Sequence, residues 1–217
     1  GETKILADAL YENAPGGFSD IPADILDKVR NGEPPFENIS CLFFTHRHGD
    51  HFSKRLAGEY LERFPDCRIF LPGAGELPET LCDRTFRLSE GLTATALPTG
   101  HLDKEFENVE HLCYLFNYDG NRILITGDAD YVSEDFGRLS GVRLKAVLLS
   151  PLFFAAIARG KYFRGSFDTE RYIICHLPFE EDDTMHMAKA LERNIGLYSG
   201  GAELTVFSRP MQRYELY

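Results

Sequence analysis

The sequence predicts an α/β protein in which helices cover β-sheets. Beyond Asp128, apolar runs of strand length alternate with stretches whose apolar residues recur at helical spacing. The middle of the chain, from residue 85 to residue 126, is rich in strand patterns. With 217 residues, 43% of them hydrophobic, the chain is long enough to bury a substantial core. We therefore expect a single domain over residues 1–217.

The first third of the chain is expected to contain three strands and two helices. Gly32 and the pair Pro34-Pro35 end the first helical pattern, and Pro65 ends the second. The second strand is a compact apolar run that leads directly into a cluster of histidines. In chain order we expect a strand at 3–10, a helix at 22–30, a strand at 39–44, a helix at 53–64 and a strand at 68–71.

The middle segment is expected to form strands joined by tight turns. Residues 85–98 have a strand pattern with Gly91 as a turn. Strands at 111–118 and 122–126 form a hairpin around residues 117–121, because Asp119-Gly120 is a strong turn signal.

The last third is expected to alternate helices and strands. Met187, Leu191 and Ile195 lie on one face of an amphipathic helix at 184–197, and the acidic run 180–183 suits the positive end of its dipole. The other elements are a short helix at 132–139, a strand at 145–149, a helix at 152–158, a strand at 172–175 and a strand at 203–208. The pattern contains no internal repeat.

The charge and the cysteines narrow the classes of function. Subtracting 34 acidic from 23 basic residues gives a formal charge of −11, which disfavours nucleic acid as a partner unless bound cations invert the field locally. The five cysteines are odd in number and form no C-x-x-C pair, so we expect reduced thiols. These residues are Cys41, Cys67, Cys82, Cys113 and Cys175.

The sequence contains no apolar run of the roughly 20 residues that a membrane helix needs. It also opens without a signal sequence, so we expect no membrane contact and a cytoplasmic location. The chain begins at Gly1 rather than Met, which leaves open whether residues precede it. A homo-oligomer is compatible with the sequence.

A dense group of metal-binding residue types follows the strand at 39–44. Three of the seven histidines, His46, His48 and His51, fall within six residues together with Asp50. Imidazole and carboxylate are ligands that suit zinc and its neighbours, and a strand end points several of them into one small volume. A lone histidine in a loop is more often a local capping group, but that interpretation does not account for four such residues together.

This segment resembles the metal-binding motif of the metallo-β-lactamase superfamily. The residues that carry the resemblance are Thr45, His46, Arg47, His48, Gly49, Asp50 and His51, directly after a strand. The resemblance covers nearly the whole chain and implies an αββα four-layer sandwich. It also implies three further ligands in order: a histidine in the middle of the chain, an aspartate after a strand, and a histidine after a late strand.

Each of these three ligands has a candidate. We favour His101 as the middle histidine, with His111 as the competitor because His111 opens an expected strand. Asp128 follows the apolar strand that ends at Gly127. His176 ends the strand at 172–175, whereas His186 is expected inside the next helix, facing solvent or packed.

The resemblance then assigns two metal ions to seven residues. One ion would bind His46, His48 and His101, the other would bind Asp50, His51 and His176, and Asp128 would lie between them. Zinc is favoured, with Mn²⁺ or Fe²⁺ as alternatives. The histidine at position 48 separates the chain from the di-iron oxidoreductase branch, which usually has a glutamate there. Thr45, Asp103 and Asp130 are candidates to hold the outer nitrogens of the histidines.

The resemblance predicts a metal-dependent hydrolase in which a hydroxide bridging two cations attacks a small ester, lactone or phosphodiester. Asp50 and Asp128 are the expected catalytic carboxylates. The segment 97–101 and the step Gly127-Asp128 are similar to those of lactonase-like relatives in the compact branch. The alternatives are an RNA-processing nuclease, for which we find no basic insert, and a metal-dependent sensing protein without turnover. Relatives usually have more strands before the metal loop, whereas only residues 4–8 are recognisable here.

Overall fold

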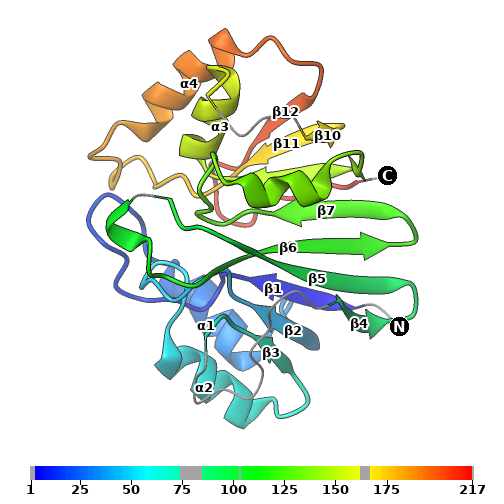
Figure 1. The fold of residues 1–217 in the computed structure, drawn as a ribbon. Helices are drawn as coiled ribbons and strands as arrows, with labels where there is room; N and C mark the ends of the chain where they lie inside the picture. Colours follow the sequence, from blue (N-terminus) through cyan, green and yellow to red (C-terminus); the bar gives the residue numbers. More distant parts are fainter. Residues whose placement is uncertain (1–2, 74–84, 103, 162–166, 217) are drawn as a thin grey trace.

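A computed structural model describes residues 3–73, 85–102, 104–161 and 167–216. It confirms the α/β class and the four-layer arrangement of helices, sheet, sheet and helices (Figure 1). Two sheets face each other in the middle of the molecule, and a pair of helices covers the outer side of each sheet.

The first sheet has three parallel strands in the order β1-β2-β3. They are β1 (Lys4–Ala7), β2 (Ile39–Phe43) and β3 (Arg68–Phe70). Helices α1 (Ala23–Asn31) and α2 (Lys54–Arg63) lie on its outer face. Leu42 and Phe44 pack there with Leu56 and Tyr60 of α2. The burial of both faces explains why β2 is a continuous apolar run.

The second sheet has seven strands in the order β12-β11-β9-β7-β6-β5-β4. Strands β4 to β7 pair antiparallel, whereas β7, β9, β11 and β12 run parallel. Helices α3 (Pro151–Ala158) and α4 (Met187–Leu197) cover its outer face. The strands are β4 (Thr85–Ser89), β5 (Leu92–Thr99), β6 (His111–Tyr118), β7 (Asn121–Ile125), β9 (Ala146–Leu149), β11 (Arg171–Ile174) and β12 (Glu203–Val206).

Aromatic side chains join the two sheets. Phe43 of β2 stacks on Phe70 of β3 with ring centroids 4.3 Å apart, and it meets the edges of Tyr114 and Phe116 of β6. The Tyr114 hydroxyl donates to the Phe44 carbonyl over 2.9 Å. Because large buried rings contribute most to core packing, this contact fixes the end of β2 against β6.

The hairpin between β6 and β7 turns at Asp119 and Gly120, as expected. Both residues have positive φ angles, 47° and 90°, which is the backbone that a two-residue hairpin turn requires. The Gly120 amide also donates to Asn117 Oδ1.

Several element boundaries differ from the expectations. The expected helix at 132–139 is a 3₁₀ helix, η2 (Glu134–Leu139). Helix α4 begins at Met187 rather than at residue 184, because both carboxylate oxygens of Asp183 accept the first backbone amides of the helix. The short elements β8 (Arg143–Leu144), β10 (Asp168–Thr169) and η1 (Lys104–Phe106) were not predicted, since two or three residues carry no periodic pattern.

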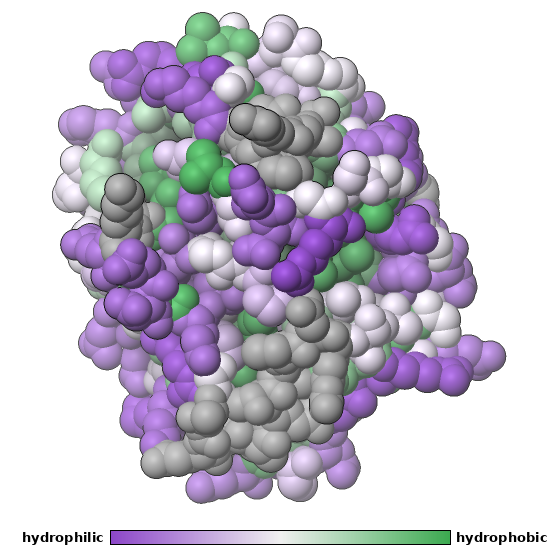
Figure 2. Space-filling model, in the orientation of Figure 1, coloured by the Kyte–Doolittle hydropathy of each residue, from purple (hydrophilic) through white to green (hydrophobic). Residues whose placement is uncertain are grey.

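Four of the five cysteines lie in the described part of the chain, and all four are free thiols. They are Cys41, Cys67, Cys113 and Cys175, whereas Cys82 lies outside the described residues. None of the described helices is both long and apolar enough to cross a membrane. On the face drawn in Figure 2, hydrophilic residues predominate and hydrophobic ones form small separate patches.

Candidate metal centre

The loop that follows β2 is held by backbone hydrogen bonds to its neighbours. The Leu112 amide of β6 donates to the Thr45 carbonyl, and the amides of His51 and Phe52 fold back onto the His48 carbonyl. Thr45 and His46 are fully buried. The loop therefore presents its side chains from a fixed backbone at the junction of the two sheets.

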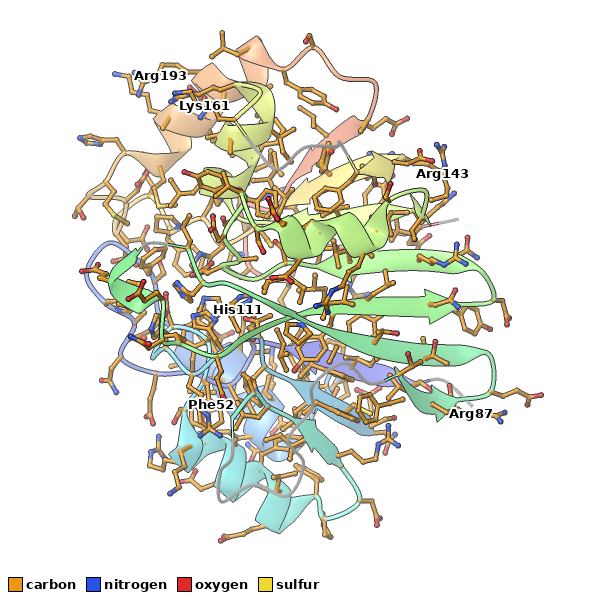
Figure 3. The ribbon with its side chains drawn as sticks, in the orientation of Figure 1. Phe52, Arg87, His111, Arg143, Lys161 and Arg193 are labelled. Carbon is orange, nitrogen blue, oxygen red and sulfur yellow. The ribbon has the colours of Figure 1, made fainter. Side chains whose placement is uncertain are left out.

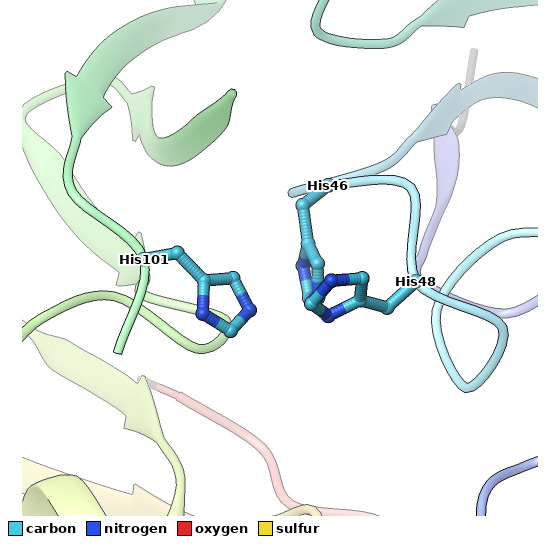
Figure 4. Close-up of side chains that lie close together, drawn as sticks. All are labelled: His46, His48 and His101. Atoms are coloured by element: carbon cyan, nitrogen blue, oxygen red, sulfur yellow. The ribbon is translucent and has the colours of Figure 1, made fainter. Parts of the chain in front are cut away.

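Three histidines form a first group (Figure 4). His46 and His48 come from the loop after β2, and His101 comes from the loop after β5. Each has one ring nitrogen within 4.8 Å of those of the other two. Their ring centroids are 4.6 to 4.7 Å apart, and Figure 4 shows the three rings facing one another. A backbone bridge between His101 and Ala129 fixes the loop that carries His101.

Asp50, His51, Asp128 and His176 form a second group, again with ligand atoms within 4.8 Å of one another. Asp128 follows β7 and His176 follows β11, two strands of the parallel part of the second sheet. The carboxyl ends of parallel strands meet at one edge of a sheet, and this brings Asp128 and His176 together. His51 also joins the two groups, because its ring centroid lies 4.1 Å from that of His46.

Hydrogen bonds fix the tautomers of three of these histidines. Thr45 Oγ1 donates to Asp8 Oδ2 over 2.7 Å, so it accepts from His46 Nδ1 at 3.1 Å. His51 Nδ1 donates to the same Asp8 oxygen over 3.0 Å. His101 Nδ1 donates to the Leu102 carbonyl. With one proton held on Nδ1, Nε2 is in each case the nitrogen that a metal would bind in the neutral imidazole.

The Nε2 atoms of His46, His51 and His101 are buried without a hydrogen-bond partner among the described residues. His51 Nε2 lies 3.3 Å from Asp128 Oδ2, but the two atoms are not aligned for a hydrogen bond. His176 Nε2 lies 3.6 Å from Asp50 Oδ2. Buried polar atoms normally have partners. Nitrogen and oxygen donors of this kind fit divalent cations such as zinc, so both groups are candidate metal-binding groups.

Burial and neighbouring charges set the protonation states of these residues. Burial, with the neighbouring histidines, lowers the pKa of His46 far below 6.5, so its imidazole is neutral. Burial alone would raise the pKa of Asp128, but the close approach of His51 Nε2 and the charges of His176 and His51 hold it well below 3.8. Burial opposes a charge on His51 as well, yet Asp8 and Asp128 raise its pKa above 6.5. His51 would have to release that proton to hold a cation there.

The structure brings all seven predicted residues into these two groups. His111, the competitor of His101, lies outside them: its Nδ1 meets Thr99 Oγ1 at 2.9 Å, and its ring lies 5.3 Å from that of His46. The ligand roles of the seven residues remain predictions. His186 is exposed and immediately precedes α4, instead of lying inside the helix.

The expected supporting residues have different positions. Thr45 does contact His46, whereas the Asp130 side chain accepts from the Val132 amide in its own loop. Asp103 lies outside the described residues. Asp8, for which the sequence alone predicts no role, contacts both Thr45 and His51. Its position directly after the strand β1 could have indicated this role, because β1 runs parallel to β2 and the two strands end side by side.

Two cavities adjoin the groups. A larger cavity of about 450 Å³ is lined by His48 and His101 of the first group and by Asp50, Asp128 and His176 of the second. A smaller cavity of about 330 Å³ is lined by all four residues of the second group and extends to the segment after β12. Phe18 lines both cavities and lies against His176, with ring centroids 4.7 Å apart. Both candidate groups are thus accessible to small molecules.

Sequence comparison and structure comparison give different results for this chain. No protein-family model and no curated protein matches the sequence. Among solved structures, an isothiocyanate hydrolase from Delia radicum gut bacteria aligns with 98% of this chain and 93% of its own, at a TM-score of 0.63 and 13% identity. The metallo-β-lactamase fold protein YhfI from Bacillus subtilis aligns over 95% of both chains, at a TM-score of 0.55 and 15% identity.

A third similar structure is CmlA, a diiron β-hydroxylase from Streptomyces venezuelae. It aligns with 94% of this chain at a TM-score of 0.51 and 14% identity, and this chain spans only 49% of its length. At these identities the likeness concerns the fold. The layer order, the strand topology and these neighbours together establish that the chain has the metallo-β-lactamase fold.

Proposed function

We propose that this protein is a dinuclear metal-dependent hydrolase that cleaves a small ester, lactone or phosphodiester. The observation that carries the proposal is the pairing of two donor groups, one with His46, His48 and His101, the other with Asp50, His51, Asp128 and His176. The groups adjoin through His46 and His51, and both open on one cavity. The similar isothiocyanate hydrolase supports a hydrolytic reaction on this fold.

Divalent cations held by these residues would supply Lewis acidity and lower the pKa of water toward about 7. The residues of the chain complete the site. Asp8 and Thr45 keep the histidine lone pairs directed inward. Burial alone would raise the pKa of Asp50, but His176 and His51 keep it below 3.8, so Asp50 is ionised. It can accept a proton from the attacking water and, because it binds that proton weakly, pass it to the leaving group.

Zinc is our proposed metal. The donors are imidazole nitrogens and carboxylate oxygens, a set that suits zinc and also accommodates Mn²⁺ or Fe²⁺. CmlA, which resembles this chain in fold over about half of its own length, is a diiron β-hydroxylase. His48 occupies the position at which the resemblance implies a glutamate in the di-iron oxidoreductases, and this supports hydrolysis over oxygen chemistry for this chain.

A nuclease is disfavoured by the distribution of basic residues. The formal charge is −11, and no lysine or arginine is among the described residues that line the larger cavity. Figure 3 shows Arg87, Arg143, Lys161 and Arg193 at the outer edges of the molecule, away from His111 at its centre. Phosphate backbones are bound by clustered lysine and arginine side chains.

Metal removal and restoration test the proposal. We would treat the protein with a chelator, measure its metal content and melting temperature, and add back Zn²⁺, Mn²⁺ or Fe²⁺. Hydrolysis would then be measured with p-nitrophenyl esters, lactones and bis-p-nitrophenyl phosphate. We expect two bound ions per chain, a higher melting temperature and metal-dependent cleavage of at least one class. Tight binding of both ions without any cleavage would favour a sensing protein and overturn the proposed activity.

A further inference from the structure

The smaller cavity has opposite charges on its lining. Among the described residues that line it, the acidic ones are Asp8, Asp50 and Asp128, all in or beside the second group. The one basic residue other than histidine is Arg209, which follows β12. The lining of the cavity thus combines the candidate metal group with an arginine from a different part of the chain.

The segment that carries Arg209 is fixed by hydrogen bonds. The Phe207 amide donates to the Ile174 carbonyl, which extends β12 along β11. Gln212 then closes the turn, because its Nε2 donates to the Val206 carbonyl over 2.8 Å and its Oε1 accepts from the Ser208 amide over 3.1 Å. Arg209 is exposed to solvent, and no carboxylate pairs with it within the described ranges. Its guanidinium is therefore available to a ligand.

Apolar side chains make up most of the remaining lining. Phe18, Leu148, Phe179 and Phe207 are among them. Pockets for small molecules typically combine such apolar lining with a few polar groups that fix the orientation of the ligand. A molecule that fills this cavity therefore needs a reactive centre at the second group, a short apolar stretch, and an anionic end.

We propose that the substrate is an ester whose acyl chain ends in a carboxylate, and that Arg209 binds this carboxylate. The planar guanidinium matches the geometry of a carboxylate and offers it two parallel hydrogen bonds. The leaving alcohol then occupies the larger cavity, where Pro15, Phe106 and Leu152 suit an uncharged group. This inference rests on the proposed hydrolase activity and names its substrate class.

The reaction consumes one water molecule and needs no other reactant. The bond between the acyl carbon and the alcohol oxygen breaks, and a bond from the acyl carbon to the water oxygen forms. One water proton goes to the leaving oxygen, and the other is released from the new carboxyl group. The products are an alcohol and a dicarboxylate.

A pair of esters that differ only in the terminal group tests the role of Arg209. We would compare kcat/KM for mono-p-nitrophenyl glutarate and p-nitrophenyl pentanoate, whose acyl chains have the same length. We expect the native protein to prefer the glutarate ester about tenfold, the lower end for hydrogen bonding to a charged group, because Arg209 is exposed to solvent. Arg209→Gln should bring the ratio close to one through a higher KM for the glutarate ester. Arg213→Gln, an exposed arginine outside both cavities, should keep the native ratio.

Binding to the metal-free protein separates this inference from the proposed activity. Titration calorimetry with glutarate should show binding by the native protein and by Arg213→Gln, and at least tenfold weaker binding by Arg209→Gln. If both esters are cleaved at equal rates and Arg209→Gln changes neither, the hydrolase stands and the role of Arg209 is overturned. If neither ester is cleaved but glutarate binding depends on Arg209, the anion site stands without hydrolysis. Equal glutarate affinity in the native protein and in Arg209→Gln would also overturn the inference.

Discussion

Asp8 and His51 are joined by a hydrogen bond of 3.0 Å between Asp8 Oδ2 and His51 Nδ1. The same oxygen accepts from Thr45 Oγ1, and Asp8 Oδ1 accepts from the Thr45 amide over 2.8 Å. Thr45 in turn contacts His46 Nδ1. One carboxylate at the end of β1 therefore orients a histidine of each group, directly for His51 and through Thr45 for His46.

Replacing Asp8 with asparagine should weaken metal binding. The amide nitrogen cannot accept a hydrogen bond. In place of Oδ2 it removes the acceptor of both His51 Nδ1 and Thr45 Oγ1, and in place of Oδ1 it removes the acceptor of the Thr45 backbone amide. Loss of such outer contacts typically lowers metal affinity by about 10- to 100-fold. Competition with a chromogenic chelator measures this affinity. The control is Asp24→Asn, on the exposed first turn of α1, and native affinity in Asp8→Asn would show that Asp8 does not orient the ligands.

The candidate site could be predicted largely because its signals are local in sequence. His46, His48, Asp50 and His51 lie within six residues after an apolar strand, and Asp128 and His176 each follow shortly after a strand. The partnership of Asp8 with His51 spans 43 residues and depends on the parallel pairing of β1 with β2, which no short pattern encodes. The same reason applies to Arg209, whose role depends on the path of the chain after β12.

For the fold as well, local patterns could be predicted from the sequence and features set by distant contacts could not. Long periodic elements such as β6 and α2 were predicted within two residues of their bounds. The start of α4 was missed because the side chain of Asp183 caps the helix from four residues upstream, and this competes with the apolar periodicity. The parallel order of β7, β9 and β11 is set by packing between distant segments, which a single sequence does not show.

Asp128→Asn should lower the metal content and abolish hydrolysis. Asp128 lies 3.3 Å from His51 Nε2 and 3.8 Å from His176 Nδ1, and an amide there can serve fewer cations than a carboxylate. The fold should persist, because the Asp128 carboxylate approaches only histidine side chains. Among the described residues it makes no hydrogen bond to the backbone. Metal analysis and circular dichroism check both statements. Asp130→Asn, two residues later in the same loop, should retain both ions; full metal content in Asp128→Asn would remove Asp128 from the site.

Gly127→Ala should lower the free energy of unfolding more than Gly120→Ala, although both glycines have a positive φ. Gly127 has φ 51°, and an added Cβ would lie 2.5 Å from Thr45 Oγ1 and 2.7 Å from Thr45 Cβ. Gly120 has φ 90°, but its added Cβ would meet no atom within 4 Å. Both changes incur a backbone penalty of about 1–2 kcal/mol, and Gly127→Ala adds about 1–3 kcal/mol of overpacking. Urea unfolding measures the difference, and equal losses in the two variants would contradict the contact with Thr45.

His111 should make the metal-free protein sensitive to acid. Burial lowers the pKa of His111 from 6.5 to about 3 in the folded state, whereas the unfolded chain keeps the ordinary value. Its contribution to stability is therefore complete above pH 6.5 and is lost as the pH falls toward 3, because only the unfolded state takes up the proton in that range. Between pH 7 and pH 5 the loss is roughly 2 kcal/mol.

Urea unfolding of the chelator-treated His111→Gln variant should show a smaller fall in the free energy of unfolding over this interval than the native protein. His186→Gln, at an exposed histidine, should keep the native fall, and an unchanged fall in His111→Gln would mean that His111 is not buried as a neutral imidazole.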